Sequence, residues 1–472
     1  MYPSAGTHKC RYVRFAGHLD LDLEKGRRVL LGWTTWAYCS RGAGAKAAAL
    51  SACGIGSGGR YRVEVKNARL NRRTPRWSEL RELVRVKAPR ISRAARVREA
   101  PTIWDLRSLA KSRTPRAAFD YTDGAAEAEI TLNRSREIYR QVEFMPSVLQ
   151  DVSSVDLSTR ILGEPSSMPL ILSPTGFTRM MHTQGEIAVA QAASEAGIPY
   201  TLSTLGTTSI DDLAAAVPNA TKWFQLYMMK DREFSKDLIE RARLGGYSAL
   251  VVTVDVPVAG ARLRDVYNGL SIPPQLNITT ILNGALHPAW WWDFLTTEPL
   301  TFATLNSSDG TVADLINRVF DPSVDFNDIA WIKEAWDGPL IVKGIQNVDD
   351  AHAVVDRGAD ALVVSNHGGR QLDRAPTTLE LLPNVVDAVG DRSEVYIDGG
   401  IMSGSDMAAA VAFGADAAMV GRAYLYGLMA GGRAGVDRAL ELLRTEYLRT
   451  LQLLGVTSTS ALDRFRVRLR TP

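Results

Sequence analysis

The nonapeptide SNHGGRQLD, residues 365–373, places a potential base three residues before a carboxylate-binding group. His367 is the kind of side chain that accepts a proton near neutral pH. Arg370 can hold a carboxylate with two parallel hydrogen bonds, and the glycines between them allow close approach of a ligand. A lone histidine is more often structural, but this combination favours proton removal from a small carboxylic acid.

An apolar run directly before this motif predicts a short buried strand that ends at the base. Seven further runs alternate with helical segments, mostly at intervals of 20–35 residues. Eight strand–helix units in series predict a (β/α)8 TIM barrel. An open doubly wound sheet is the alternative, but no GxGxxG follows a predicted strand and opens a helix. The predicted strands are Pro169–Ser173, Tyr200–Ser203, Trp223–Tyr227, Ala249–Val254, Leu340–Val342, Ala361–Val364, Val395–Ile397 and Ala417–Val420.

The ends of these strands carry residues that can bind a cofactor. Gly399 and Gly400 follow the seventh strand and Arg422 the eighth, where barrels often bind phosphate. Lys343, after the fifth strand, suits either stabilisation of a reduced flavin or a Schiff base. Candidate hydrogen-bond partners for the edge of a flavin ring are Ser203, Gln225 and Thr253.

Charge and cysteine content separate the first hundred residues from the rest. The net charge of the chain is +3, yet residues 1–100 hold 22 Lys+Arg against 7 Asp+Glu. All three cysteines lie at or before Cys53, so the remaining chain has no disulfide, thiolate metal site or cysteine nucleophile. This distribution favours a reducing cytoplasm. Nucleic-acid binding would rest on the basic segment alone, and we expect neither a nucleic-acid partner nor a metal.

Three segments are expected. Residues 1–64 lack periodicity and are interpreted as a disordered leader or as lying outside the functional protein. Residues 65–100 form a basic extended arm with a short helix near Ser78–Val84, and residues 101–472 form the catalytic barrel. Thr102 is a predicted helix N-cap. The segment 120–125 is expected to break the helical pattern before a helix over Glu127–Arg140, giving an N-terminal helical extension that plugs one end of the barrel.

A long insertion, about residues 258–335, follows the fourth strand and contains Trp290–Trp292. Such a segment is interpreted either as a lid or subunit contact, or as a patch that rests on a membrane surface. No apolar stretch is long enough to span a bilayer, and no signal peptide is recognised. We expect a cytoplasmic protein, located at the inner face of the cell membrane if the second interpretation holds.

From about Thr102 to the C-terminus, the chain resembles the FMN-dependent 2-hydroxy acid oxidoreductases. The SNHGGRQLD motif carries the resemblance, and four further motifs match in order and spacing: QLY at 225–227, TVD at 253–255, VKG at 342–344 and DGG at 398–400. Residues 113–123 and 254–274, with the Trp-rich loop, are most similar to actinobacterial L-lactate dehydrogenases. The resemblance implies FMN and a homo-tetramer or larger assembly.

The resemblance also implies a role for each matching residue. His367 takes the α-proton, and Asp255 stabilises the imidazolium that forms. The substrate carboxylate and hydroxyl are bound by Arg262, Arg370, Tyr121 and Tyr227. Lys343 stabilises the reduced flavin, and Asp398 binds the ribityl chain. The remaining predicted cofactor-binding residues are Pro174, Thr175, Gly176, Ser203, Gln225, Thr253, Ser365, Gly399, Gly400, Gly421 and Arg422.

Two positions depart from the family pattern. Met402 stands where an arginine near the phosphate is usual, and Gly176 replaces an alanine found in several oxidases and is expected to leave room beside the flavin. The leading hypothesis is oxidation of a small L-2-hydroxy acid, with electrons passing to a quinone or cytochrome. L-lactate, which would give pyruvate, is the favoured substrate. An oxygen-using oxidase or monooxygenase acting on glycolate, lactate or mandelate is the alternative. An FMN barrel with isomerase or nucleotide-reducing activity is a second alternative, but barrel nucleotide dehydrogenases use a cysteine nucleophile and residues 54–472 contain no cysteine. A third alternative, a non-catalytic flavin- or phosphate-binding protein, would need neither the base nor the carboxylate clamp.

Overall fold

The computed structural model describes residues 92–269, 286–297, 317 and 320–470, together with the backbone of 12–13, 28–30 and 36–38. The chain divides into two units, residues 1–88 and 89–472. In the first unit, strands β1 (Tyr12–Val13), β2 (Arg28–Leu30) and β3 (Trp36–Tyr38) form an antiparallel sheet in the order β1-β3-β2. The helix expected near Ser78–Val84 lies outside the described residues, and the leader hypothesis stays a prediction.

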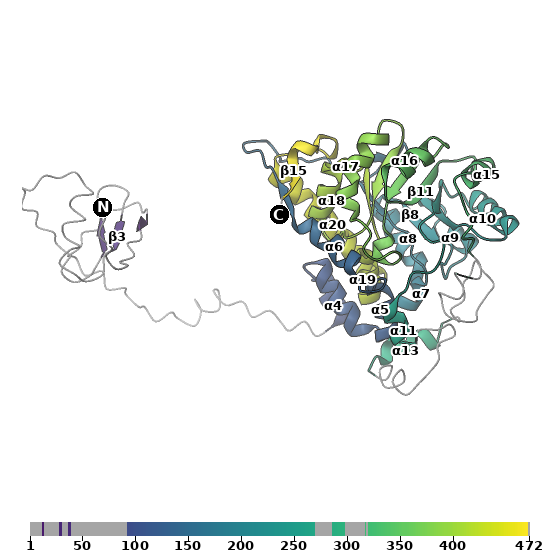
Figure 1. The fold of residues 1–472 in the computed structure, drawn as a ribbon. Helices are drawn as coiled ribbons and strands as arrows, with labels where there is room; N and C mark the ends of the chain where they lie inside the picture. The colour runs from purple at the N-terminus through teal and green to yellow at the C-terminus, as the bar shows by residue number, and fades with distance from the viewer. Residues whose placement is uncertain are drawn as a thin grey trace, which may run out of the picture. The chain divides into compact units, whose positions relative to one another are not determined.

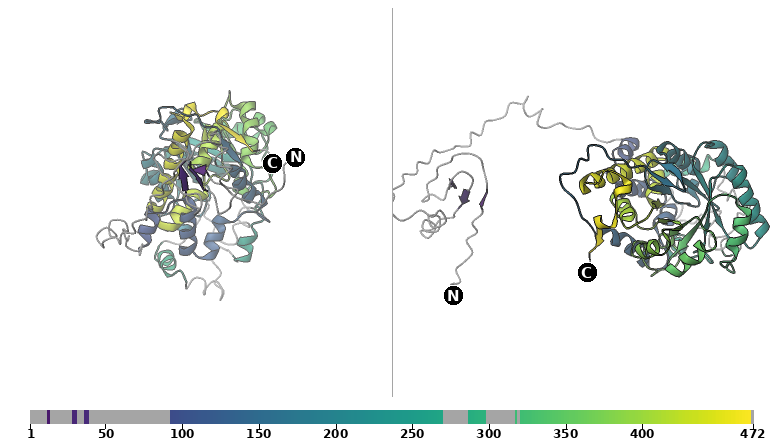
Figure 2. Two further views of the ribbon diagram at one scale, coloured as in Figure 1. Left: turned by 90° about the vertical axis from the view of Figure 1, so that its left-hand side faces the viewer. Right: turned by 90° about the horizontal axis from the view of Figure 1, so that it is seen from above.

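Eight parallel strands of the second unit close into a barrel, which confirms the predicted fold (Figures 1 and 2). Each strand overlaps one of the predicted runs, and its ends differ from the predicted ends by at most a few residues. Short aliphatic and aromatic runs suit strands that are buried on both faces. The strands are β7 (Leu170–Leu172), β8 (Tyr200–Ser203), β9 (Lys222–Tyr227), β10 (Ala249–Thr253), β11 (Leu340–Ile345), β12 (Ala361–Val364), β13 (Glu394–Ile397) and β14 (Ala417–Val420).

Alternate strand residues form two separate cores. One cluster gathers residues such as Val251, Val363 and Met419, which share one side of the strands and fill the barrel interior. There Trp223 stacks on Tyr396 with ring centroids 6.1 Å apart. The other residues of the strands pack outward against the helices. The barrel is therefore solid, and a ligand must bind at one of its ends.

Helices surround the barrel, as the view from above in Figure 2 shows. Several begin at a side-chain cap, which fixes where the preceding loop ends; Asp231, for example, accepts a hydrogen bond from the backbone N–H of Phe234. The helices are α8 (Gly185–Ala196), α9 (Ile210–Ala216), α10 (Arg232–Leu244), α15 (Asp328–Ala335), α16 (Val348–Val355), α17 (Thr378–Val389), α18 (Gly404–Ala412), α19 (Arg422–Gly431) and α20 (Arg433–Leu454).

The N-terminal extension consists of α3 (Arg93–Arg98), α4 (Ile103–Arg113), α5 (Arg116–Asp123) and α6 (Ile130–Arg140). Thr102 caps α4 as predicted, accepting from the N–H of Asp105 at 3.2 Å. The break expected at 120–125 was wrong for its first four residues, which lie in α5. The helix expected from Glu127 begins only at Ile130, because Glu127 and Glu129 adopt positive φ values of 45° and 60°.

A hairpin and an insertion also belong to this unit. A hairpin of β5 (Thr159–Ile161) and β6 (Glu164–Ser166) places Ile161 in the interior cluster and so closes the N-terminal end of the barrel. The insertion after β10 contains α11 (Leu263–Tyr267) and α13 (Pro288–Leu295). Among the described helices, none combines the length and apolar character that crossing a bilayer requires.

Candidate active site

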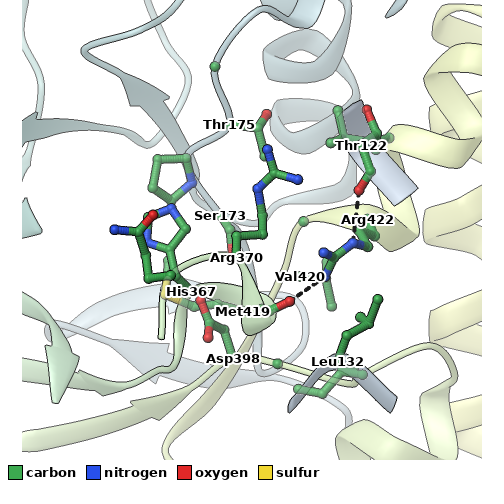
Figure 3. A pocket seen from close by; sticks show the side chains of 18 of the residues that line it. Thr122, Leu132, Ser173, Thr175, His367, Arg370, Asp398, Met419, Val420 and Arg422 are labelled. Atoms are coloured by element: carbon green, nitrogen blue, oxygen red, sulfur yellow. Dashed lines mark hydrogen bonds between the residues drawn. The ribbon is translucent and has the colours of Figure 1, made fainter. Parts of the chain in front are cut away.

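A cavity that is open to solvent lies at the carboxyl ends of the barrel strands (Figure 3). Fourteen of the nineteen residues predicted from sequence line it: Tyr121, Pro174, Thr175, Gly176, Tyr227, Arg262, Lys343, His367, Arg370, Asp398, Gly399, Gly400, Gly421 and Arg422. The other five, Ser203, Gln225, Thr253, Asp255 and Ser365, belong to the strand ends behind this lining. The polar and glycine residues predicted at the strand ends therefore lie together at one end of the barrel.

His367 and Asp255 form a hydrogen-bonded pair at the ends of β12 and β10. Nδ1 of His367 lies 2.9 Å from Oδ1 of Asp255, and the Asp255 side chain is buried. Burial raises the pKa of Asp255, but His367 and Lys343 outweigh it and hold that pKa below its usual value. The ionised carboxylate accepts a hydrogen bond from Nδ1–H of His367, which leaves Nε2 of His367 as the basic atom.

A strained turn presents His367 to the cavity. His367, Gly368 and Gly369 have successive φ values of 56°, 61° and 76°, a left-handed conformation that is costly for a non-glycine residue. A Cβ on Gly369 would lie 2.8 Å from the backbone nitrogen of Leu132 in α6. The motif needs its glycines because the turn packs directly against this helix.

Arg262 and Arg370 lie over the same aromatic ring, as the predicted carboxylate clamp requires. Their guanidinium carbons are 5.8 Å and 4.9 Å from the ring centroid of Tyr121. Burial and the neighbouring Arg262 lower the pKa of Arg370. The nearest acid, Asp265, is 4.0 Å from Arg262, and burial raises the pKa of Asp265. Arg370 also donates to the backbone carbonyls of Tyr121 and Gly124. These carbonyls carry no charge, so the two guanidinium groups still favour binding of a small anion.

Tyr227 adds a neutral hydroxyl to this side of the cavity. Its ring stacks on Phe320 with centroids 4.5 Å apart, and burial together with Asp255 raises the pKa of Tyr227. The phenol therefore remains protonated and can donate a hydrogen bond to a substrate.

Lys343 is buried between two polar groups at the base of the cavity. Its ammonium lies 2.8 Å from a carboxylate oxygen of Asp398 and donates to Oγ of Ser365 at 2.8 Å. Burial lowers the pKa of Lys343, but Asp398 and Asp255 raise it more, and the net shift is upward. Schiff-base chemistry needs a neutral amine, so this environment favours the alternative role of a permanent cation.

Arg422 lies at the N-terminus of α19, but its guanidinium is largely used within the protein. It donates to the backbone carbonyls of Thr122, Gly368 and Gly124 at 2.9, 2.9 and 2.7 Å. Burial lowers the pKa of Arg422 to about 10. The sequence suggested a free phosphate-binding cation here; in the structure Arg422 also holds α5 and the His367 turn together.

A family model described as FMN-dependent dehydrogenase matches residues 110–469. The chain belongs to this family. Over 395 residues it is 56% identical to a Mycobacterium tuberculosis protein named "Putative L-lactate dehydrogenase", covering 84% of this chain and 95% of that protein. It is 40% identical to an L-lactate dehydrogenase of Vibrio cholerae, covering 76% of this chain and 97% of the relative. The solved structure of a monotopic membrane protein, (S)-mandelate dehydrogenase, matches with a TM-score of 0.76 and 38% identity, covering 79% and 100% of the two chains.

The residues around the cavity fit the FMN that this family uses. Buried Nε2 of Gln225, Oγ1 of Thr253 and Oδ1 of Asp398 have no hydrogen-bond partner among the described residues. Because buried polar atoms are nearly always paired, these three indicate a missing polar ligand. Ser203 donates to Oε1 of Gln225 at 3.1 Å and so fixes the orientation of that amide.

One expectation about room in this FMN site was wrong. A Cβ on Gly176 would lie 2.9 Å from Cβ of Leu205 and 3.1 Å from its carbonyl oxygen. Leu205 therefore occupies the space that the absent methyl group was expected to leave open. Gly176 consequently gives no argument for or against an oxygen-using member of the family.

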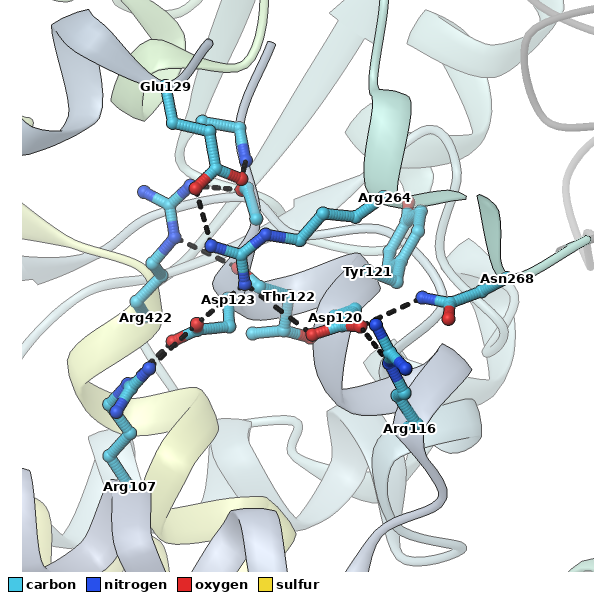
Figure 4. A network of polar contacts seen from close by, with 12 residues as sticks. Arg107, Arg116, Asp120, Tyr121, Thr122, Asp123, Glu129, Arg264, Asn268 and Arg422 are labelled. Atoms are coloured by element: carbon cyan, nitrogen blue, oxygen red, sulfur yellow. Dashed lines mark hydrogen bonds and ion pairs between the residues drawn. The ribbon is translucent and has the colours of Figure 1, made fainter. Parts of the chain in front are cut away.

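The sequence reasoning missed the groups that hold the substrate side in place. Arg264 pairs with Asp120, Asp123 and Glu129 (Figure 4), and Asp123 also pairs with Arg107 at 2.6 Å. This set is called the Arg264 network below. A signal was present, because Asp120 and Asp123 stand about one helical turn apart and Arg264 follows Arg262 by two residues.

Gln371 was also missed, although it lies within the nonapeptide. Its side chain donates to the carbonyls of Asp255 and Val258 at 3.2 and 2.9 Å and accepts from the N–H of Gly260 at 3.2 Å. It therefore joins the turn that carries His367 to the loop that leads to Arg262.

Proposed function

We propose that this protein oxidises L-lactate to pyruvate as an FMN-dependent dehydrogenase. The observation that carries the proposal is the convergence of the His367–Asp255 pair and the two guanidinium groups at one cavity. A base beside a carboxylate clamp suits a 2-hydroxy acid. In addition, this chain matches nearly the whole length of relatives named L-lactate dehydrogenase. Bound FMN supplies the two-electron acceptor for this oxidation.

Each side chain has a defined task in this proposal. Arg262 and Arg370 bind the carboxylate of lactate and orient its 2-carbon. Tyr121 and Tyr227 hydrogen-bond the carboxylate and the hydroxyl. Nε2 of His367 accepts the proton that the substrate loses, and Asp255 stabilises the resulting imidazolium. Asp255 does so without taking the proton, because its carboxyl group has a lowered pKa.

The cofactor-binding residues divide along the cavity. Gln225, Thr253 and Ser203 would hold the polar edge of the flavin ring. Lys343 remains charged and would stabilise the negative charge that the flavin ring gains on reduction. Asp398 serves the ribityl chain, while the predicted phosphate end comprises Gly399, Gly400, Gly421 and Arg422.

Purified protein should be yellow, and L-lactate should bleach it in the absence of air. D-lactate at the same concentration is the matched control and should leave the colour unchanged. A yellow protein that L-lactate does not bleach, but (S)-mandelate does, would transfer the proposal to the mandelate alternative. A colourless protein that takes up no added FMN would contradict the proposal as a whole.

We further propose a quinone or cytochrome as electron acceptor, reached at the inner face of the cell membrane. Two insertion helices support contact with a membrane: α13 exposes 72% of Trp292 and 73% of Leu295, and α11 exposes 80% of Tyr267. Trp290 differs from the expectation of an exposed Trp cluster, because it is buried and donates to the carbonyl of Met180 at 3.1 Å. It anchors α13 to the barrel unit, while Trp292 is available to a bilayer.

Flotation with anionic vesicles tests this surface. The variant Trp292→Ser with Leu295→Ser should lose vesicle binding and keep its rate with a soluble quinone analogue. Leu453→Ser is a matched control, since Leu453 is 72% exposed on α20. Rapid reoxidation by dissolved oxygen together with indifference to quinone analogues would sink the acceptor proposal.

The assembly and the leader complete the proposal. We expect a homo-tetramer or larger assembly, which light scattering on the purified protein measures. Deletion of residues 1–64 should leave activity intact if this segment lies outside the functional protein. Collapse of activity on that deletion would refute this part alone.

A further inference from the structure

Helix α6 packs directly on the loop that follows β13. A Cβ on Gly400 would lie 1.9 Å from the carbonyl oxygen of Ser135 and 3.0 Å from the ring of Tyr139. Only a glycine permits this approach, and its φ of 85° is also one that glycine adopts readily. The carboxylate of Asp373 caps the helix, accepting from the N–H of Thr131 at 2.8 Å. The helix is thus fixed against the predicted phosphate end of the cavity.

Arg136 extends from α6 into the lining of this cavity. It follows Leu132 by four residues, so both lie on one face of the helix, and both line the cavity together with Gly400 and Met402. Arg136 donates to the hydroxyl of Tyr426 at 3.3 Å, and its guanidinium lies 5.2 Å from the ring centroid of Trp104. These contacts hold the side chain in place without neutralising it.

The phosphate end of the cavity is short of available positive charge. A phosphate monoester carries about −1.5 to −2 charges near pH 7. Met402 contributes an apolar side chain, and Arg422 donates to three backbone carbonyls. Lys343 is paired with Asp398. Among the described arginines and lysines that line the cavity near this end, Arg136 alone has neither an ion pair within 4.0 Å nor a set of carbonyl acceptors.

We propose that Arg136 binds the phosphate of FMN as a further cation of that subsite, beside Arg422. The inference rests on the proposed FMN site and adds a cation from a helix outside the barrel to the phosphate-binding groups predicted from the sequence. Its guanidinium can offer two parallel hydrogen bonds to phosphate oxygens. The loop glycines and the N-terminus of the ten-residue helix α19 provide backbone N–H groups on the other side.

Full-length protein freed of flavin and titrated with FMN, and separately with riboflavin, tests the proposal through quenching of flavin fluorescence. Riboflavin lacks the phosphate but keeps the ring. Arg136→Ala should weaken FMN binding roughly 10- to 100-fold, the usual size of a hydrogen bond to a charged group. Riboflavin binding should stay within about twofold of the wild-type value. Arg134→Ala is the control, since Arg134 lies on the same helix and pairs with exposed Glu380.

Two further variants separate charge from structure. Arg136→Lys should keep part of the preference for FMN, because it retains the charge but not the fork. The double variant Arg136→Ala, Met402→Arg should regain FMN affinity, because it returns a cation to the same cavity wall. If Arg136→Ala does not fold, Arg136→Met preserves the apolar stem, and the ratio of the two affinities is read from that protein.

If Arg136→Ala weakened the binding of FMN and of riboflavin equally, Arg136 would act only through its contacts with Trp104 and Tyr426, and the proposal would be overturned. An unchanged ratio of FMN to riboflavin affinity would do the same. Neither result touches the proposed function, because bleaching of the wild-type protein by L-lactate is measured independently. A wild-type protein that binds FMN no better than riboflavin would overturn the phosphate subsite itself.

Discussion

The barrel and the segments outside it contribute different chemistry to one cavity. Strand ends supply the buried, fixed groups: His367 with Asp255, and Lys343 with Asp398. The N-terminal helices and the insertion supply Tyr121, Arg136 and Arg262, which are placed through packing and ion pairs. The comparison suggests that the barrel carries the redox and proton chemistry, while the outer segments provide much of the recognition of charged ligand groups.

The variant His367→Gln is the strongest test of the chemistry assigned to the barrel strand ends. Glutamine keeps a polar side chain of similar reach but cannot accept the substrate proton, so kcat should fall by roughly 10³-fold or more. The visible spectrum of bound FMN should be unchanged, since the ring contacts involve other residues. Turnover close to wild type in this variant would remove His367 from its role as base.

Arg370→Lys tests the clamp, where a strand-end motif meets an outer helix. A lysine retains the charge but loses the bidentate geometry, so KM for L-lactate should rise roughly 10²-fold with a smaller fall in kcat. The rate of FMN reduction at saturating lactate reports the chemical step alone, so it separates the effect on kcat from the effect on KM. A kcat loss as large as that of His367→Gln, with KM unchanged, would place Arg370 in the chemical step instead.

Asp123→Asn tests what holds the outer segments in place. Asp123 is buried, and although burial raises its pKa, Arg107 and Tyr426 bring the net pKa well below its usual value. A carboxyl with a lowered folded-state pKa adds stability above its unfolded pKa of about 3.9, and that stability is lost as pH falls towards the folded value. At pH 7 the variant should lose about 2 kcal/mol of unfolding free energy.

The difference in stability between wild type and Asp123→Asn should therefore shrink as pH falls from about 5 towards 3. Thermal or denaturant unfolding across this range measures it. A difference that does not depend on pH would mean that Asp123 contributes through packing rather than through its charge.

The two halves also differ in how far the sequence predicts them. Barrel strands are local apolar runs, and parallel strands bring their carboxyl ends to one edge, so the convergence of His367, Lys343 and Asp398 follows from pattern alone. The segment 120–125 was expected to break a helix because its residues are small and polar, yet residues 120–123 are helical. Distant arginines, Arg107 and Arg264, pair with the carboxylates of Asp120 and Asp123 and so stabilise this last turn of α5.

Arg422 shows the same limit from the barrel side. Its position at a strand end is predictable, but the carbonyls that occupy it come from α5 and from the turn at Gly368. Those acceptors depend on positive φ values and on helix packing, which no local periodicity encodes. Arg136 was missed for a related reason, since only tertiary packing brings α6 to Gly400.

Arg264→Ala is the mildest test of the comparison, because Arg264 is placed to orient the clamp and no ligand contact is assigned to it. Its removal leaves Asp120 and Glu129 without this partner, while Asp123 keeps Arg107. The loop that carries Arg262 should become less ordered, and KM for L-lactate should rise roughly tenfold with kcat nearly unchanged. Arg116→Ala is the matched control: Arg116 also pairs with Asp120, but it is 73% exposed, so its loss should matter little. Equal effects of the two variants would mean that the network contributes general stability and does not position Arg262.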